Sequence, residues 1–283
     1  MKEKYYILFF ILISISFFPQ NKQKNILEND KGNIITNEIE QKKLETLRVL
    51  ELNNQIKQFY KVETTQNNVQ QCSNGEFEEF ITNNGVPYAK DFNFYLTNVS
   101  NSQCNAIIPS NTISTYYIPK YNFNANIYAA MVPSNYIDPY LGNIKAFDQY
   151  ALKLNYNGSQ NAITTSKRIK TSNKIQFNYK VVMQTIMDDS HIGKQPYFKA
   201  RILNQQGVAV DEFCLVADTE NCIYKRRKEN DQVYTLYTPE WRIGNLNISS
   251  IPNNEEFTVE FIAARCGLNG HFSYAYIDKI ICE

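Results

Sequence analysis

Apolar and polar residues alternate over much of the C-terminal two-thirds of this 283-residue chain. The alternation is clearest over 174–186, where Ile175, Phe177, Tyr179 and Val181 are separated by polar residues. A period of two is that of a strand with one buried face. The same pattern predicts further strands over 72–80, 151–155, 197–203, 208–216 and 256–264, and a last strand that follows the Gly267–Gly270 turn and ends on Cys282.

Helical periodicity is missing from this part of the sequence, and residues 81–146 are loop-rich, with five prolines among aromatic residues. Several short strands without intervening helices predict an all-β fold, an antiparallel two-sheet jelly-roll sandwich over residues 72–283. The aromatic content of 13% agrees with this class, because Tyr and Phe favour half-buried pleated surfaces.

The N-terminus is typical of an export signal. Lys2 and Lys4 precede an apolar run that ends at Phe18, and Pro19 follows. This order predicts a signal peptide over 1–20 and a secreted or cell-surface protein with no membrane span after processing. Because the residues around Pro19 do not form a small-x-small cleavage site, an uncleaved anchor is the alternative.

Residues 21–71 are a polar linker that contains one amphipathic pattern. Ile39, Leu44, Leu47, Leu50 and Ile56 recur at helical intervals and predict a short helix over 37–61. This helix is either a docking or self-association element, or a spacer.

Six cysteines, an even number in a chain predicted to be exported, favour disulfides over free thiols. Cys214 and Cys222 flank a short polar loop, and a bridge across that loop is expected. If the first and last strands are neighbours, Cys72 lies near Cys282. Cys104 and Cys266 complete the candidates. A zinc site is disfavoured, because there is no Cys-x-x-Cys motif and the chain has two histidines.

Charge gives no reason to expect a nucleic-acid partner or an anionic membrane surface. The formal net charge is +1, from 29 basic and 28 acidic residues. Strong electrostatic attraction to a polyanion needs a marked basic excess, which is lacking here.

Three motifs together resemble a known family. They are the segment 74–78 (Asn-Gly-Glu-Phe-Glu), the segment 191–201 (His-Ile-Gly-Lys-Gln-Pro-Tyr-Phe-Lys-Ala-Arg), and the closing segment 266–278, which ends in Tyr-Ile-Asp. They resemble the β-sandwich domain of secreted flavobacterial surface and gliding-motility-associated proteins, and more broadly the galactose-binding-like jelly roll of carbohydrate-binding modules. The resemblance covers roughly residues 72–282.

The resemblance implies a structural calcium where the first and last strands meet. It places ligands at Glu78 and Asp278, with a main-chain carbonyl near Gly75 or Glu76. Ca²⁺ takes six to eight oxygen ligands, so two carboxylates need carbonyls and water to complete a site. The family's second acid is replaced here by Lys279, and the alternative is a pair of acids bonded to main-chain amides.

A sugar site needs exposed rings beside hydrogen-bonding groups, because sugar faces stack on aromatic rings. We expect Tyr136, Tyr140 and Trp241 to supply the rings, and Asp188 and His191 the polar contacts. The alternative is that these rings pack under loops. His271 is expected to stabilise the glycine-rich turn.

The function predicted from these observations is a secreted, non-catalytic binding module whose partner is a polysaccharide or glycan. The alternative is a structural or adhesion protein that binds another surface protein, and a glycosidase ranks below both. Glycosidases place two acids at a defined separation across a cleft, and no spaced motif nominates such a pair.

Overall fold

The computed structural model describes residues 72–97, 104, 116–120, 128–156, 161–268 and 270–283. The predicted signal peptide at 1–20 and the predicted helix at 37–61 lie outside these residues. Within the described ranges, no helix is long and apolar enough to cross a membrane. Their one helical element is a single 3₁₀ turn, η1 (Asp189–His191).

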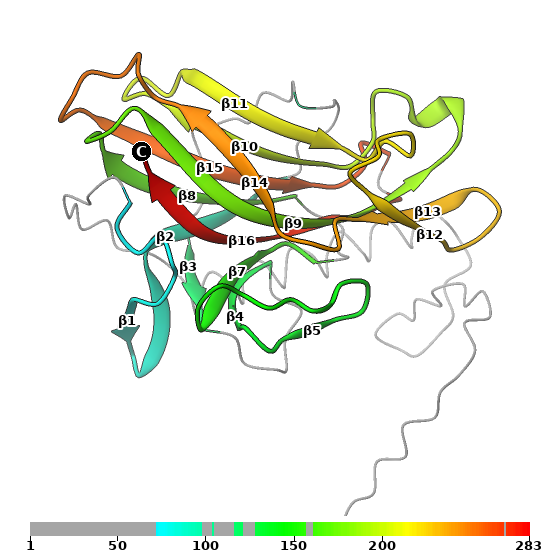
Figure 1. The fold of residues 1–283 in the computed structure, drawn as a ribbon, viewed down its shortest axis with the longest axis horizontal. Helices are drawn as coiled ribbons and strands as arrows, with labels where there is room; N and C mark the ends of the chain where they lie inside the picture. Colours follow the sequence, from blue (N-terminus) through cyan, green and yellow to red (C-terminus); the bar gives the residue numbers. More distant parts are fainter. Residues whose placement is uncertain (1–71, 98–103, 105–115, 121–127, 157–160, 269) are drawn as a thin grey trace, which may run out of the picture. The chain divides into compact units, whose positions relative to one another are not determined.

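The strands form two antiparallel sheets, which confirms the all-β sandwich (Figure 1). The first sheet has, in spatial order, β1 (Phe80–Asn83), β2 (Val86–Thr97), β8 (Asn161–Ile169), β15 (Glu256–Ala264), β10 (Tyr197–Leu203) and β11 (Ala209–Val216). Strand β3 (Tyr116–Pro119) also pairs with β2.

The second sheet has, in spatial order, β12 (Lys225–Lys228), β13 (Val233–Tyr237), β9 (Lys174–Ile186), β16 (Ser273–Cys282), β7 (Tyr150–Leu154) and β4 (Ala129–Pro133). Strand β14 (Arg242–Asn247) pairs with the first half of β9, and β13 pairs with the second half. A small hairpin of β5 (Ile137–Asp138) and β6 (Gly142–Asn143) lies in the connection from β4 to β7.

Alternation along the strands places one side of each sheet in a shared core. Large aromatic side chains fill its centre, where the Phe177 ring lies 5.0 Å from Phe261 and 5.6 Å from Phe213, measured between centroids. Phe177, Phe198 and Phe261 are completely buried. Burying a side chain of this size contributes roughly 1.5–3 kcal/mol, so this cluster is a main source of stability.

The predicted bounds of β9, β10 and β15 are confirmed to the residue. Along most of each strand, every second residue is apolar and lies in the shared core. The expectation of a loop-rich segment over 81–146 is wrong for β2. Asp91 has a φ of 68°, and the register of β2 against β3 shifts between Tyr88 and Asn93. The bulge moves the buried positions from Ala89 to Phe92, so the period of two is interrupted in the sequence.

The predicted opening strand at 72–80 is also wrong, since turns occupy most of it before β1 begins. Asn74 has a φ of 49°, and its side-chain Oδ1 accepts a hydrogen bond from the Glu79 N–H at 2.8 Å. Such local side-chain bonds compete with a strand ladder. Gly75 accepts a hydrogen bond from the Ile280 N–H at 2.9 Å, and a Cβ at this glycine would meet the Ile280 carbonyl. The two ends of the sandwich therefore do meet.

Two disulfides close the described part of the chain. Cys72 is joined to Cys282 with the Cα atoms 5.9 Å apart, which is the pairing expected where the chain ends meet. Cys104 is joined to Cys214 with the Cα atoms 6.0 Å apart, so the predicted bridge from Cys214 to Cys222 is wrong. Cys222 is an exposed free thiol and Cys266 a buried one.

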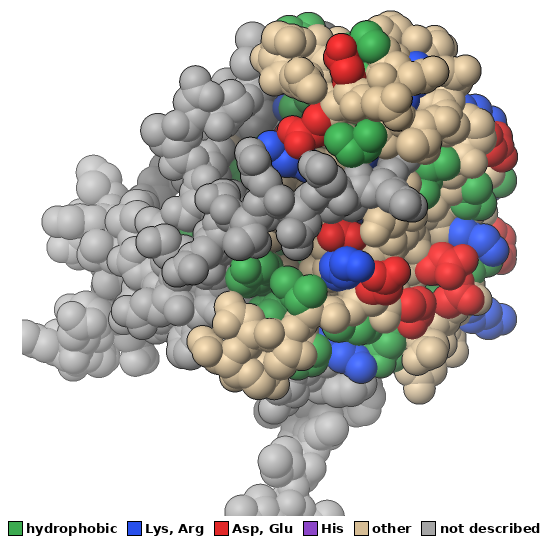
Figure 2. Space-filling view, turned by 90° about the vertical axis from the view of Figure 1, so that its left-hand side faces the viewer, with side chains coloured by type: hydrophobic (Ala, Val, Ile, Leu, Met, Phe, Trp, Pro, Cys, Tyr) green, Lys and Arg blue, Asp and Glu red, His purple; other side chains and the backbone are tan. Residues whose placement is uncertain are grey.

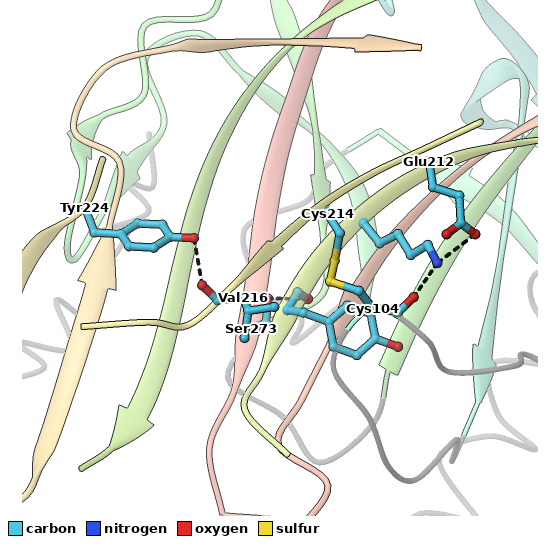
Figure 3. Close-up of a disulfide and its surroundings, with 8 residues drawn as sticks. Cys104, Glu212, Cys214, Val216, Tyr224 and Ser273 are labelled. Carbon is cyan, nitrogen blue, oxygen red and sulfur yellow. Dashed lines mark hydrogen bonds and ion pairs between the residues drawn. A yellow bond between two sulfur atoms is a disulfide. The ribbon is translucent and has the colours of Figure 1, made fainter. Parts of the chain in front are cut away.

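The bridge between Cys104 and Cys214 joins Cys104 covalently to the edge strand β11 (Figure 3). Lys199 of the neighbouring strand β10 donates a hydrogen bond to the Cys104 carbonyl and lies 2.8 Å from the Glu212 carboxylate. Cys214 lies inside β11 opposite Lys199, whereas Cys222 follows a turn beyond the end of that strand. Strand pairing thus separates the two cysteines that are close in sequence.

Acidic and basic side chains lie next to one another on the face drawn in Figure 2, with hydrophobic side chains between them. This mixture agrees with the near-zero net charge.

Candidate functional site

The outer face of the second sheet carries an aromatic cluster of its own. On β16, Ala275 and Ile277 pack into the shared core, whereas the alternating Tyr274 and Tyr276 pack into a second buried cluster. The other buried members of this second cluster are Val132, Ile144, Ala151 and Val182. Both tyrosines are almost fully buried, so another part of the chain must cover this face.

The connection at 134–149 provides that cover, and Asp138 fixes it in place. Asp138 is 1% exposed, and its Oδ2 accepts hydrogen bonds from the two tyrosine hydroxyls of β16 at 2.7 and 2.9 Å. Its Oδ1 accepts from the main-chain N–H groups of Tyr140 and Leu141 at 2.8 and 3.0 Å. Burial, and then the Asp138 charge, hold the pKa of both tyrosines well above the usual range, so they remain donors.

Lys153 of β7 lies among the same rings. Its Nζ donates to the Tyr136 hydroxyl at 3.0 Å and lies 4.9 Å from the centre of that ring. The same ammonium is 5.2 Å from the ring centre of Tyr274 and 5.7 Å from that of Tyr276. Cation–π contacts of this kind contribute roughly 0.5–2 kcal/mol each, depending on exposure. The Tyr136 hydroxyl is therefore engaged within the protein.

Trp241 and Phe147 form a ring pair at the edge of this cluster. The Trp241 indole N–H donates to the carbonyls of Ile144 and Lys145 at 3.1 and 2.8 Å, which fixes the orientation of the ring. The Phe147 ring lies 5.6 Å from Trp241 at an interplanar angle of 45°, and Phe147 is 48% exposed. The Lys279 ammonium lies 5.4 Å from the Phe147 ring centre.

A second pair continues the aromatic surface. The Tyr140 ring lies 6.3 Å from Phe272, and the Arg227 guanidinium is 5.4 Å from the Tyr140 ring centre. We call the five partly or largely exposed rings the aromatic rim; its members are Tyr136, Tyr140, Phe147, Trp241 and Phe272.

The structure thus brings together the three aromatic residues expected from the sequence, Tyr136, Tyr140 and Trp241. Sequence reasoning missed Phe147 and Phe272. Phe147 is one ring in a polar stretch, and no pattern marked it. Phe272 stands inside the closing motif at 266–278, which drew attention to other residues.

Asp188 and His191 lie elsewhere, after the end of β9 and around η1. Asp188 lines a cavity of about 480 Å³, whose walls also include Thr185, Gln195 and Thr219, and His191 precedes the lining residue Ile192 in the chain. None of the residues that line this cavity is aromatic. It therefore offers hydrogen-bonding groups without a stacking surface, and the expected single site of five residues divides into two regions.

Glu78 and Asp278, the expected calcium ligands, both reach the end of the connection that covers the second sheet. Glu78 Oε1 accepts from the N–H groups of Gln149 and Tyr150 at 2.7 and 2.9 Å. Asp278 Oδ2 accepts from the Phe147 N–H at 2.8 Å, and its Oδ1 accepts from the following residue's N–H at 2.8 Å. The two acids therefore hold the start of β7 and the position of Phe147.

Asp278 is completely buried, and burial raises its pKa to about 7. The two main-chain N–H donors oppose this rise, and the neighbouring carboxylates of Asp148 and Glu78 add to it. Both expected ligands already accept two main-chain hydrogen bonds, as in the metal-free alternative. Three acids near one another still make a cation favourable there on electrostatic grounds, so calcium stays a prediction.

No protein-family model matches the chain, and no curated protein matches it. Among solved structures, TmCBM61 in complex with β-1,4-galactotriose is 10% identical over 55% of this chain and 83% of that one, with a TM-score of 0.27. A β-sandwich carbohydrate-binding module of promiscuous specificity is 10% identical over 70% and 86%, with a TM-score of 0.29. The K2 adhesin domain of Lys-gingipain is 14% identical over 54% and 80%, with a TM-score of 0.31. Values this low identify neither a family nor a ligand for this chain.

Proposed function

We propose that this chain is a non-catalytic carbohydrate-binding module and that the aromatic rim is its sugar-contacting surface. The observation that supports this most directly is the ring pair of Phe147 and Trp241. The Phe147 ring is half exposed. The Trp241 ring is held in orientation because its indole N–H donates hydrogen bonds to two main-chain carbonyls. Fixed rings of this kind suit stacking on sugar faces, because little conformational freedom is lost on binding.

Polar groups surround this ring pair at the protein surface. Asp148 and Glu240 are exposed and stand next to Phe147 and Trp241 in the chain. The exposed Lys145 accepts a hydrogen bond from the Trp241 indole N–H at its carbonyl, and the Lys279 ammonium lies over Phe147. Sugar hydroxyls need donors and acceptors placed beside the stacking surface, and these side chains provide both. The aromatic rim offers both stacking rings and hydrogen-bonding groups to a polysaccharide, whereas the cavity beside Asp188 offers hydrogen-bonding groups without aromatic rings.

Two further expectations belong to the same proposal. Disulfides persist in oxidising compartments, so the bridges Cys72–Cys282 and Cys104–Cys214 support action outside the cell. Calcium at Glu78 and Asp278 would stabilise the segment that presents Phe147, since Asp278 accepts from that residue's N–H.

Binding can be tested by affinity electrophoresis of the chain through gels that contain soluble polysaccharides. Phe147→Ala removes an exposed ring, so we expect the fold to remain and the retardation by the recognised polysaccharide to fall at least tenfold in apparent affinity. Val208→Ala is the matched control, because Val208 is 58% exposed in the turn between β10 and β11, away from the rim.

Two results would contradict the proposal. One is the absence of retardation by every polysaccharide in a panel of neutral and acidic polymers. The other is equal retardation of the wild-type chain, Phe147→Ala and the control, which would place any sugar site away from the rim.

A further inference from the structure

Two loops far apart in sequence meet at one end of the sandwich. Strand β10 begins opposite the end of β15, with Tyr197 paired to Ala264. The loop before β10 and the turn after β15 are therefore neighbours, and the Gly267 N–H donates to the Lys194 carbonyl at 2.9 Å. Each loop is also closed internally by a 2.9 Å hydrogen bond, from the Lys194 N–H to the His191 carbonyl and from the Cys266 N–H to the His271 carbonyl.

This meeting brings together three metal-ligating side chains. One ligand atom each from His191, Cys266 and His271 lies within 4.8 Å of the others. The two imidazole rings are 5.1 Å apart between centroids, at an interplanar angle of 66°. Ligand atoms around a tetrahedral zinc ion lie roughly 3.3–3.6 Å apart, given the usual Zn–N and Zn–S bond lengths. Small side-chain rotations would bring the three ligand atoms, now within 4.8 Å of one another, to the spacing of a zinc site.

Each donor is in a state suited to coordination. His271 Nδ1 is buried and has no hydrogen-bond partner, which is costly for a polar atom unless something else satisfies it.

The surroundings of Cys266 and His191 also suit metal binding. Cys266 is a completely buried free thiol, and its Sγ accepts a hydrogen bond from the Leu268 N–H at 3.4 Å. His191 Nδ1 lies 3.0 Å from the Ser190 hydroxyl and 3.5 Å from the Asp188 carboxylate. A carboxylate at one ring nitrogen leaves Nε2 for the metal, as in carboxylate–histidine–zinc arrangements.

We propose that His191, Cys266 and His271 bind a zinc ion. Two imidazoles and a thiolate favour zinc over the hard cations calcium and magnesium, which prefer oxygen ligands. Three protein ligands leave a fourth position for water, and solvent reaches the site because the His191 side chain is 13% exposed. The cavity of about 480 Å³ adjoins this position through Asp188 and Ile192.

Spacing in the sequence argued against zinc, because the ligands do not form a Cys-x-x-Cys motif. His191 stands 75 residues before Cys266, and the pairing of β10 with β15 brings them together. This site is independent of the aromatic rim, so its test does not depend on sugar binding.

The test uses the chain with its disulfides intact, freed of metal by a chelator and then dialysed. Zinc chloride is titrated in by calorimetry, and cobalt(II) chloride is used as a spectroscopic substitute. We expect one zinc per chain and a thiolate-to-cobalt charge-transfer band in the near ultraviolet. Cys266→Ser should abolish that band, and His271→Gln should weaken zinc binding at least tenfold. Cys222→Ser, which removes the other free thiol, should change neither result.

Circular dichroism establishes that the variants are folded. If Cys266→Ser fails to fold, the wild-type chain and Cys222→Ser are compared instead. A charge-transfer band of equal strength in both proteins identifies Cys266, the remaining free thiol, as the cobalt ligand. The proposal is overturned if cobalt gives no thiolate band in the wild-type chain, if the band disappears in Cys222→Ser, or if folded His271→Gln binds zinc as tightly as the wild type.

Discussion

Replacing Asp278 by Asn should change how the stability of this protein depends on pH. Asp278 is completely buried, and its pKa is raised to about 7 from an ordinary value of 3.8. The folded state therefore favours the protonated, neutral carboxyl. The neutral Asp278 carboxyl contributes to the free energy of unfolding. This contribution is fully present below pH 3.8 and is lost as the pH rises towards 7. Asparagine carries no charge at any pH, so the variant lacks this loss.

The size of the effect follows from the shift. One pKa unit corresponds to 1.36 kcal/mol, so a rise from 3.8 to about 7 amounts to about 4 kcal/mol. In the variant, the carbonyl oxygen of the asparagine side chain can still accept a hydrogen bond from the Lys279 N–H. The NH₂ group of that side chain would face the Phe147 N–H, and the lost bond costs about 1–3 kcal/mol at every pH. The pH-dependent part of the difference is therefore separable from the constant part.

The assay is guanidinium unfolding of the wild type and Asp278→Asn between pH 4 and pH 8, in the presence of a chelator. Titration of groups far from Asp278 cancels in the difference between the two proteins, whereas Asp148 and Glu78 interact with Asp278 directly. We expect this difference to move in favour of the variant by up to about 4 kcal/mol across that range. A difference that stays constant with pH would refute the reasoning. Calcium added at pH 8 should stabilise the wild type more than the variant if the predicted site exists.

Two further substitutions test the packing that supports the rim. Gly244→Ala should cost about 1–3 kcal/mol in the same unfolding assay, because the new Cβ would meet the buried Phe177 ring; no change would show that β14 moves freely away from β9. Asp138→Ala removes the acceptor of four hydrogen bonds and should cost at least about 2–3 kcal/mol. It should also weaken polysaccharide binding through loss of order at 134–149, whereas full binding with reduced stability would separate the rim from this anchor.

The sequence by itself determined the class of fold and the strands in which every second residue is apolar. Every second side chain of β9, β10 and β15 is buried in one core. Because these positions must be apolar, the sequence itself shows which residues form the strands. The turn that begins at Gly267, before the last strand, was predicted in the same way. The sequence pattern failed to predict the strands correctly at two places. One is the bulge at Asp91 in β2, and the other is the side-chain hydrogen bond of Asn74 before β1.

Strand β8 shows why a polar sequence can still form a central strand. It lies between β2 and β15, and its Thr164 hydroxyl donates to the Asn93 carbonyl of β2 at 2.9 Å. Buried polar groups of this kind are satisfied by a neighbouring strand, which the sequence of β8 alone does not reveal.

Tertiary structure decided the features that join distant segments. The Cys104–Cys214 disulfide, the aromatic rim, and the meeting of His191 with Cys266 and His271 all depend on which strands are neighbours. Sheet order is set by the total burial and hydrogen bonding of all the strands together, because each strand has two edges and many possible partners. The local pattern therefore fixes which face of a strand is buried, and only the assembled sandwich fixes what that strand lies beside.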